Sequence, residues 1–204
     1  MNGKDKDEKA IKVILLGESG IGKTSIIRRY INNEFSQYSE STLGTTFLVK
    51  EIVKKNIIYR LIIWDTSGQE KYHSVTNLFI NNSNIVILIY SIDSRISFEG
   101  LDYWYNSIKE RLEGENYILA IVGNKSDLID DEAVPEEEGK KFAESKNAIF
   151  KLVSAKSFPE GINDLFNTLL DELIKKNYID KAEESVTILK RNHKMKKKKK
   201  LLIS

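Results

Sequence analysis

A glycine-rich loop near the N-terminus constrains this chain more than any other stretch. The loop matches the pattern G-x-x-x-x-G-K-[ST], and its fixed positions are Gly17, Gly22, Lys23 and Thr24. An apolar, β-branched run, Ile11–Leu16, precedes the loop, and apolar residues at helical spacing follow it over Lys23–Asn33. Backbone N–H groups of such a loop and of the following helix N-terminus converge on one anion. We therefore predict a phosphate site, in preference to a glycine-rich turn without function, with Lys23 supplying charge and Thr24 a hydroxyl ligand for Mg²⁺.

Length and composition favour a single domain with a full core. The chain has 204 residues, of which 41% are hydrophobic, and it contains no cysteine. The lack of cysteine excludes disulfides and thiolate metal sites and is compatible with a reducing compartment. The first ten residues are polar and charged, unlike a secretory signal, and no apolar run approaches the roughly 20 residues of a membrane helix. The sequence therefore predicts a cytoplasmic protein that does not span a membrane.

Positive charge gathers at the C-terminal end. Residues 180–204 hold nine Lys and Arg residues against three Asp and Glu residues, a net charge of +6. The whole chain carries +2, which leaves −4 for the remainder. An acidic body argues against nucleic-acid binding by the globular part and confines any polyanion contact to the tail. We expect a disordered N-terminus over residues 1–10, a folded domain over 11–178 and a flexible lysine-rich tail over 179–204.

Strand and helix patterns alternate along the folded part. Beyond the first strand, strands are predicted at Phe47–Lys55, Ile57–Trp64, Ile85–Ser91, Tyr117–Asn124 and Ala148–Ser154. Helices are predicted after the glycine-rich loop and near Ser97–Glu113, Pro135–Lys146 and Ile162–Ile174. The second and third strands are separated by Asn56 alone, which leaves no room for a helix and predicts an antiparallel hairpin. The pattern indicates an α/β fold, a doubly wound six-stranded and mostly parallel sheet with one antiparallel hairpin strand.

Polar residues follow the strands where the strand carboxyl ends meet at one edge of such a sheet. The sequence WDTSGQE closes the third strand, and Asp65 in it is a candidate carboxylate for a magnesium–phosphate site. Gly68 can approach a terminal phosphate through its backbone N–H, and Gln69 can orient an attacking water. Taken alone, the pattern D-x-x-G is a weak signal and usually marks a turn.

Two further motifs indicate which base the phosphate chain carries. NKSD, residues 124–127, ends the fifth strand, and the Asp127 carboxylate can accept both guanine donors, N1–H and N2–H₂, which adenine lacks. The Lys125 stem can cover the base, and Asn124 can tie this loop to the phosphate loop. SAK (Ser154, Ala155 and Lys156) follows the sixth strand, where the backbone N–H of Ala155 can reach guanine O6. A polar turn that caps a helix is the alternative for N-x-x-D.

As a set, these motifs and the stretch STLG, in this order, resemble a P-loop small GTPase of the Ras superfamily and of the Rab type. The resemblance covers about residues 12–175, and its Rab character comes from WDTSGQEKYHS, YSIDSRISFEGLDYW and VPEEEGKKFA. The segment NEFSQYSESTLGTTFLVK is similar to switch I of the endosomal Rab branch. The resemblance implies GTP and GDP as ligands, Mg²⁺ as cofactor, and an exchange factor, a GTPase-activating protein and effectors as partners.

The resemblance also assigns roles to individual residues. The phosphate contacts are Ser19, Gly20, Ile21, Gly22, Lys23, Thr24, Ser25 and Gly68. The Mg²⁺ ligands are Thr24, Thr42 and Asp65, and the catalytic residues are Gln69 and Lys23. The guanine contacts are Phe35, Asn124, Lys125, Asp127, Ser154, Ala155 and Lys156. The aromatic triad that faces effectors is Phe47, Trp64 and Phe79, for which plain core packing is the alternative.

The sequence departs from the Rab pattern at four places. Ser67 stands where the family usually has alanine beside the terminal phosphate, and FINNS, residues 79–83, replaces the usual Y-Y-R-G-A. Leu152 and Val153 replace the usual E-T ahead of S-A-K. The family ends in one or two prenylated cysteines, whereas this sequence ends in KKKKKLLIS, so either the anchor is absent or the true terminus is missing.

The expected function is a switch that binds GTP, hydrolyses it slowly and recruits effectors in vesicle and endosomal traffic on cytosolic membrane faces. Three alternatives stay open. The first is a GTP-binding interaction module with little or no hydrolysis, which Ser67 favours. The second is a P-loop kinase or ATPase, which NKSD disfavours. The third is a polyanion-binding protein that acts through its lysine tail, where we expect weak electrostatic contact with anionic membranes. We assign no catalytic role to His73 or His193, the two histidines.

Overall fold

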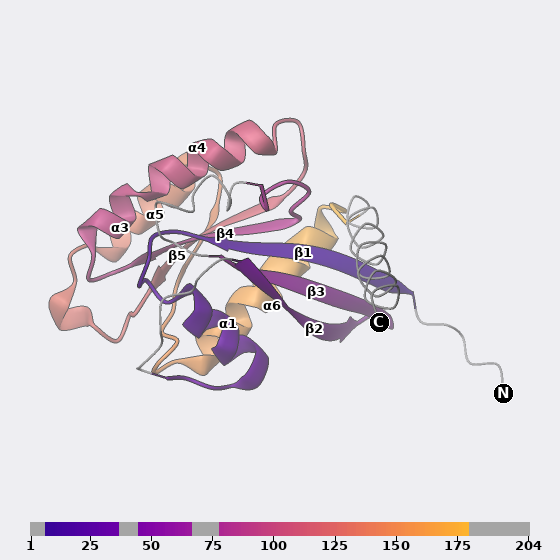
Figure 1. Ribbon diagram of the computed structural model, residues 1–204, viewed down its shortest axis with the longest axis horizontal. Helices are drawn as coiled ribbons and strands as arrows, with labels where there is room; N and C mark the ends of the chain where they lie inside the picture. The colour runs from indigo at the N-terminus through magenta and orange to yellow at the C-terminus, as the bar shows by residue number, and fades with distance from the viewer. Residues whose placement is uncertain (1–6, 37–44, 67–77, 180–204) are drawn as a thin grey trace, which may run out of the picture.

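One mixed sheet organises the part of the chain that the structure, a computed structural model, describes: residues 7–36, 45–66 and 78–179 (Figure 1). The strands are β1 (Glu8–Leu16), β2 (Thr45–Lys54), β3 (Ile57–Thr66), β4 (Ile85–Ser91), β5 (Ile118–Asn124) and β6 (Ile149–Leu152). They lie in the order β2-β3-β1-β4-β5-β6. The central strand β1 therefore has β3 on one side and β4 on the other, and the loop after β1 leaves the sheet where the strand order reverses. In open α/β sheets, ligands bind at that point.

Helices cover both faces of this sheet. The α-helices of the described residues are α1 (Lys23–Asn32), α3 (Arg95–Glu99), α4 (Leu101–Arg111), α5 (Glu136–Ser145) and α6 (Pro159–Lys175), and a 3-10 turn, η2, spans Ile129–Asp131. The structure confirms the predicted fold class.

The hairpin between β2 and β3 is the antiparallel part of the sheet. Its register runs from Thr45 opposite Thr66 to Lys54 opposite Ile57. Lys55 and Asn56 form the turn with φ of 50° and 65°, the left-handed geometry that matches the twist of a two-residue hairpin. The pairs β1–β3, β1–β4, β4–β5 and β5–β6 are all parallel. The mixed sheet is thus confirmed strand by strand.

The apolar strand runs are continuous because both faces of the sheet are buried. Along β1, the side chains of Ile11, Val13 and Leu15 join a core with α1 and α6. Ile14 and Leu16 join a second core with α4 and α5 on the opposite face, and Figure 1 shows α4 and α1 on opposite sides of the strands. Each such side chain removed from water contributes about 1.5–3 kcal/mol to stability.

The structured domain extends beyond both predicted boundaries. We expected residues 1–10 to be disordered, but β1 begins at Glu8, because its backbone pairs with β3 from Ile58 onward. Glu8 also forms an ion pair with Arg60 of β3. At the other end, Ile179, assigned to the tail, is buried against the core that contains α6. Both corrections have the same cause. Glu8 and Ile179 are ordered by partners in the sheet and in the core, and the sequence next to them does not indicate those partners.

The single helix predicted near residues 97–113 is two helices. Gly100 separates α3 from α4, and glycine is a poor helix former. A Cβ added to Gly100 would lie 2.9 Å from Oε1 of Glu18, so the carboxylate of the glycine-rich loop packs against this break. Trp104 in the first turn of α4 donates an indole hydrogen bond to the same oxygen at 3.3 Å. The helix break therefore receives a side chain from the loop after β1.

Candidate nucleotide-binding site

The glycine-rich loop wraps around the ammonium group of Lys23. Nζ of Lys23 donates hydrogen bonds to the carbonyl oxygens of Gly17 at 2.7 Å and Glu18 at 2.6 Å. Lys23 is only 5% exposed, and this burial lowers the pKa of its amine to about 8, against the opposing effect of Asp65 and Glu18. A positive charge is thereby held inside the loop at the N-terminus of α1, where backbone N–H groups and the helix dipole also attract anions.

Two positions of this loop require glycine because atoms of other segments approach their Cα atoms closely. Gly17 has φ of 140°, and a Cβ there would overlap the carbonyl oxygen of Ile89 on β4. Gly22 has φ of 94° and caps α1, where a Cβ would overlap the side-chain amide of Asn124. Ser19 and Gly20 form the exposed tip of the loop, whereas Ile21 is buried. The predicted phosphate contacts from Ser19 to Ser25 thus form one continuous turn into α1.

Thr24 and Asp65 bring two oxygen ligands together from different elements. The Thr24 hydroxyl lies 2.8 Å and 3.1 Å from the two carboxylate oxygens of Asp65, near the end of β3. Asp65 is 5% exposed, and burial raises the pKa of its carboxyl group, while the bond from Thr24 opposes the shift. A half-buried hydroxyl beside a buried carboxylate fits Mg²⁺, which prefers hard oxygen ligands and whose charge would offset the buried carboxylate. The third predicted ligand, Thr42, lies outside the described residues.

Asn124 joins the phosphate loop to the loops after β5 and β6. Its side-chain Nδ2 donates to the carbonyl of Ile21 at 2.7 Å, and its Oδ1 faces the N–H of Ala155 at 3.3 Å. Asn124 is 1% exposed, so both contacts are shielded from water and correspondingly costly to break. The N–H of Ala155, predicted to reach guanine O6, is held in this structure by a long hydrogen bond.

Asp127 lies in the same loop cluster. Its carboxylate accepts a hydrogen bond from the Ser154 hydroxyl, and Nζ of Lys156 lies 3.8 Å from its second oxygen. Ser154 in turn accepts from the N–H of Ser157 at 2.9 Å, which holds the turn after β6. The structure thus places Asp127 between the two residues of SAK that carry side-chain donors.

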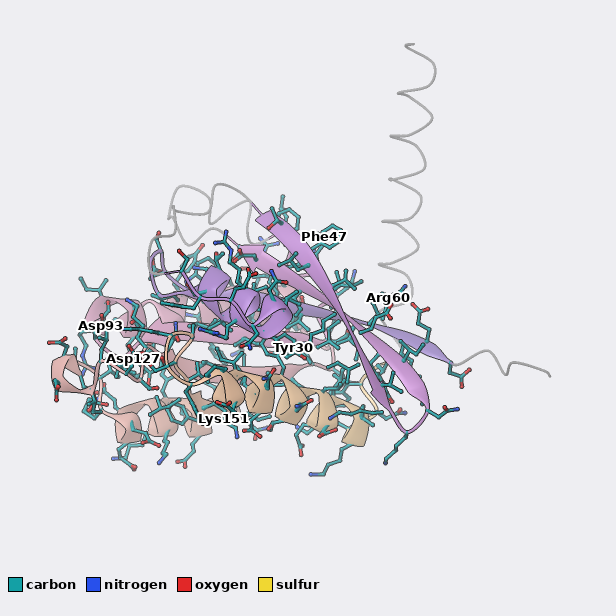
Figure 2. The ribbon with its side chains drawn as sticks, turned by 90° about the horizontal axis from the view of Figure 1, so that it is seen from below. Tyr30, Phe47, Arg60, Asp93, Asp127 and Lys151 are labelled. Carbon is teal, nitrogen blue, oxygen red and sulfur yellow. The ribbon has the colours of Figure 1, made fainter. Side chains whose placement is uncertain are left out.

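Lys125 takes a left-handed backbone conformation with φ of 61°, and its Nζ lies 3.5 Å from Oδ2 of Asp93. Asp93 also accepts a hydrogen bond from the hydroxyl of Ser91, the last residue of β4. Figure 2 shows Asp93 and Asp127 at one end of the molecule and Arg60 toward the other. Sequence reasoning missed Asp93, because an acidic residue after a strand has no partner that local spacing reveals.

The aromatic triad predicted to face effectors is contiguous. The ring of Trp64 on β3 lies 5.3 Å from that of Phe47 on β2 and 5.0 Å from that of Phe79. Phe47 is 47% exposed, whereas Trp64 is 9% exposed and contributes to the core beside α4. Trp64 is therefore mainly a core residue, and Phe47 is the member of the triad whose ring is most clearly exposed at the surface.

Three predicted site residues, Thr42, Gly68 and Gln69, lie outside the described residues, so the structure places none of them. Ser67, the two histidines and the lysine-rich end of the tail also lie outside the described residues. Of the part of the chain that is described, no helix is long and apolar enough to cross a bilayer.

Arg29 and Glu18 also contact the site, and sequence reasoning assigned neither. Arg29, in the last turn of α1, donates through Nε to the carbonyl of Ala155 at 2.8 Å. An arginine near a helix C-terminus signals a cap, but nothing in the local sequence indicates that it also reaches the loop after β6. Glu18 links the phosphate loop to α4 through Trp104.

A lysine-bearing loop at a helix N-terminus, joined by a buried asparagine to a carboxylate-bearing loop, defines a P-loop nucleotide-binding domain. The model of the Ras family matches residues 12–175, and the chain belongs to this family of small GTPases, which hydrolyse GTP. Family membership excludes the P-loop kinase or ATPase that the glycine-rich loop alone left open.

Several proteins similar to this chain are Rab proteins. The chain is 36% identical over 169 residues to Ras-related protein Rab-17 of Homo sapiens, a match that covers 83% of this chain and 79% of that protein. It is 39% identical over 177 residues to the putative ras-related protein Rab-5B of Dictyostelium discoideum, covering 87% and 81%. It is 38% identical over 147 residues to Ras-related protein Rab-31 of Mus musculus, covering 72% and 75%. The resemblance to the Rab type is confirmed.

Proposed function

We propose that the chain is a guanine-nucleotide-dependent switch that binds GDP and GTP with Mg²⁺ and recruits effectors in vesicle and endosomal membrane traffic. The observation that carries the proposal is the position of Asn124, whose side chain touches both the phosphate loop and Ala155. One ligand with a phosphate chain and a base therefore bridges the loops that this residue joins. Asp127 selects guanine, because its carboxylate accepts from two adjacent donors that adenine does not offer.

The residues around Lys23 perform the phosphate chemistry mainly by position and charge. Lys23 pairs with the β- and γ-phosphate oxygens, and the N-terminus of α1 directs its N–H groups at the same anion. Thr24 and Asp65, with Thr42, hold the metal. Bound Mg²⁺ supplies charge that stabilises the phosphate oxygens during transfer. Because the surrounding groups are buried, these electrostatic contacts act in a medium that screens them weakly.

Gln69 orients the attacking water, and Thr42 and Gly68 sense the γ-phosphate. Loss of that phosphate removes the contacts that hold both segments, which is how hydrolysis becomes a change in partner binding. We assign no arginine of this chain to the transition state, so rapid hydrolysis requires one from a GTPase-activating protein. Ser67 supports a second candidate, a GTP-bound module that scarcely hydrolyses, because its hydroxyl stands next to the terminal phosphate where alanine is usual.

Effectors, in this proposal, contact the face that carries Phe47, Trp64 and Phe79. Support comes from the contiguity of the three rings and from the exposed ring of Phe47. Aromatic groups that are partly exposed beside buried ones are typical anchors of protein interfaces. The endosomal assignment rests on the similarity of the segment from Asn33 to Lys50 to switch I of endosomal Rab proteins.

The lysine run near the C-terminus is proposed to bring the chain to the cytosolic face of anionic membranes. Lys194 and the five lysines at 196–200 each contribute up to about 1 kcal/mol near an anionic surface at low salt, and screening reduces this. Sedimentation with anionic vesicles at low salt, release as salt rises and no binding to neutral vesicles would support the electrostatic contact. Binding to neutral vesicles at high salt would contradict it.

Two measurements on the purified full chain test the switch itself. Equilibrium titration with GDP, GTP and ATP in the presence of Mg²⁺ should show far tighter binding of the two guanine nucleotides. Equal affinity for ATP and GTP would overturn the guanine assignment. Single-turnover hydrolysis of bound GTP separates the slow GTPase from the inert module, because only the former releases phosphate.

A further inference from the structure

The guanidinium group of Arg29 holds backbone groups from two separate segments. Its Nε donates to the carbonyl of Ala155 at 2.8 Å, and Nη2 lies 3.4 Å from the carbonyl of Lys156. Its Nη1 donates to the backbone carbonyl of Asn33 at 2.9 Å and lies 3.3 Å from the Asn33 side-chain oxygen. One side chain of α1 therefore connects the loop after β6, which Figure 1 shows beside α1, with the residues that follow α1.

The partners of Arg29 are neutral oxygens. Among the described residues, no carboxylate forms an ion pair with Arg29, although arginine pairs best with carboxylates. The three nitrogens of the planar guanidinium instead make four contacts with carbonyl oxygens, whose directions they constrain. The neighbouring Arg28 is exposed and makes no hydrogen bond to another described residue. The charge of Arg28 does act on the Asp65 carboxylate, so the matched control is instead Lys109, an exposed cation on α4.

The contact with Ala155 completes a ring of hydrogen bonds that joins α1, the phosphate loop and the loop after β6 around the candidate nucleotide site. The N–H of Ala155 donates to Oδ1 of Asn124, and the carbonyl of Ala155 accepts a hydrogen bond from Arg29. Asn124 in turn holds the carbonyl of Ile21 in the phosphate loop, and that loop leads directly into α1. Because Ala155 is 3% exposed, water does not readily replace either bond. Loss of the bond from Arg29 to Ala155 would break this ring but leave the two hydrogen bonds of Asn124 in place.

The other half of the guanidinium fixes the turn after α1. Asn33 has a left-handed φ of 58°, and its N–H returns to the carbonyl of Arg29 at 3.0 Å. The ring of Phe35, two residues on, lies 5.9 Å from Cζ of Arg29, within range of a cation–π contact. Arg29 thus sets the direction in which the chain leaves α1 toward the segment that contains Thr42.

We propose that Arg29 is a positioning residue that locks the loop containing Ala155 against the end of α1, and thereby slows release of bound GDP and GTP. The inference rests on the proposed binding of guanine nucleotides at this site. Without the guanidinium, the carbonyls of Ala155 and Lys156 lose their donors, and the base loop and Phe35 move independently. The ammonium group of Lys23, on which the phosphate chemistry depends, donates to Gly17 and Glu18 rather than to the partners of Arg29. Release should accelerate while the hydrolytic step is preserved.

The test compares three variants of the full chain loaded with a fluorescent GDP in the presence of Mg²⁺. Arg29→Met keeps an unbranched side chain but removes every donor, Arg29→Lys keeps the charge with one compact donor group, and Lys109→Met is the control. We expect GDP dissociation about tenfold faster for Arg29→Met, as for loss of a charge-assisted hydrogen bond. Arg29→Lys should give a smaller increase and Lys109→Met none. Wild-type dissociation by Arg29→Met would overturn the proposal.

Two further measurements separate positioning from general damage to the fold. Single-turnover hydrolysis of preloaded GTP should keep its wild-type rate in Arg29→Met, whereas a parallel fall in hydrolysis and melting temperature without rescue by lysine would indicate a structural role and overturn the proposal. The double variant Arg29→Met/Phe35→Leu should release GDP less rapidly than the product of the single effects predicts. If the effects of the two substitutions on GDP release simply multiply, the inferred coupling between the base loop and Phe35 would be contradicted. Absence of GDP binding by the wild type would instead refute the proposed function, a result distinct from all of these.

Discussion

The side-chain amide of Asn124 occupies the space that a Cβ on Gly22 would need. A Cβ on Gly22 would lie nearer to Nδ2 of Asn124 than 3.0 Å, a separation that real Cβ contacts essentially never show. Nδ2 is held there by its bond to the carbonyl of Ile21. The glycine and the asparagine are 102 positions apart in the sequence, yet each fixes what the other can be.

Replacement of Gly22 by alanine should therefore abolish tight GDP binding. The added methyl group meets Asn124 in a buried site, and φ of 94° adds backbone strain. Gly20→Ala is the matched control, because Gly20 also has a positive φ, 77°, but no atom lies within 4 Å of the place where its methyl group would stand. Titration with fluorescent GDP should show a loss of at least about a hundredfold for Gly22→Ala and a much smaller one for Gly20→Ala. Equal losses would show that strain rather than contact with Asn124 decides.

Replacement of Asp127 by asparagine should shift base preference from guanine toward xanthine. The carboxylate accepts two hydrogen bonds, whereas an amide offers one acceptor and one donor, which suits a base with a carbonyl in place of the guanine amino group. The Ser154 hydroxyl, which donates to Asp127, still finds an acceptor in the amide oxygen, so the loop should persist. Competition of GDP and xanthosine diphosphate for the variant is the measurement. Retention of the wild-type preference for GDP would contradict the role of Asp127.

The fold was predictable because its strands carry unmistakable local patterns. Ile85–Ser91 is buried along its whole length and matches its predicted bounds, since a strand covered on both faces reads as an unbroken apolar run. The start of β1 was not predictable, because Glu8 is held by the ladder to β3 and by Arg60, which lies 52 positions away. Likewise, Gly100 is tolerated inside a helix by sequence rules, and its contact with Glu18 appears only in three dimensions.

The candidate site divides in the same way. Motif spacing predicted the loop residues and the tie between Asn124 and the phosphate loop, which the structure shows as the bond from Asn124 to Ile21. It could not predict Arg29, since a side chain that binds backbone carbonyls of a distant loop requires no particular residue type in that loop. A side chain that bonds to backbone carbonyls places no requirement on the residue types that carry those carbonyls, so the sequence of the loop does not reveal the contact.

Replacement of Gln69 by leucine should cut GTP hydrolysis while leaving GTP affinity nearly unchanged. In the proposed mechanism the Gln69 amide orients water in the transition state and contributes little to ground-state binding, so its loss lowers turnover more than affinity. Single-turnover phosphate release, measured beside GTP titration, separates the two quantities. Hydrolysis at the wild-type rate would show that another group orients the water.

Replacement of Ser67 by alanine should accelerate intrinsic hydrolysis. The resemblance to Rab proteins implies that this position lies beside the terminal phosphate, where the family usually has alanine. In the proposed mechanism, a hydroxyl there would compete for the attacking water or alter the switch equilibrium. Phosphate release from preloaded GTP is again the measurement, with Ser145→Ala, an exposed serine at the end of α5, as the control. An unchanged rate in Ser67→Ala would mean that the hydroxyl does not limit hydrolysis.

Stability should depend on pH through Lys12, which lies on β1 beneath the aromatic triad. Its Nζ donates to the carbonyl of Asn81 at 2.7 Å and lies 5.4 Å from the ring centroid of Trp64. Burial lowers the pKa of Lys12 from 10.5 to about 8, although the charge of Glu115 opposes the shift. Between these values the unfolded chain binds more protons than the folded one, so this group makes the free energy of unfolding rise with pH, by at most about 1.4 kcal/mol per pH unit.

Lys12→Met should therefore flatten the rise in stability between pH 8 and about 9.5, a window below the ordinary titration of tyrosines. Urea unfolding at fixed, saturating GDP, followed by tryptophan fluorescence at several pH values, gives the free energy for each protein. Lys109→Met, at an exposed position on α4, is the control and should keep the wild-type slope. The difference between wild type and Lys12→Met must grow in favour of the wild type as pH rises, because only the wild type sheds a buried charge. Curves that stay parallel across this window would show that Lys12 remains protonated and is solvated well enough to keep its ordinary pKa.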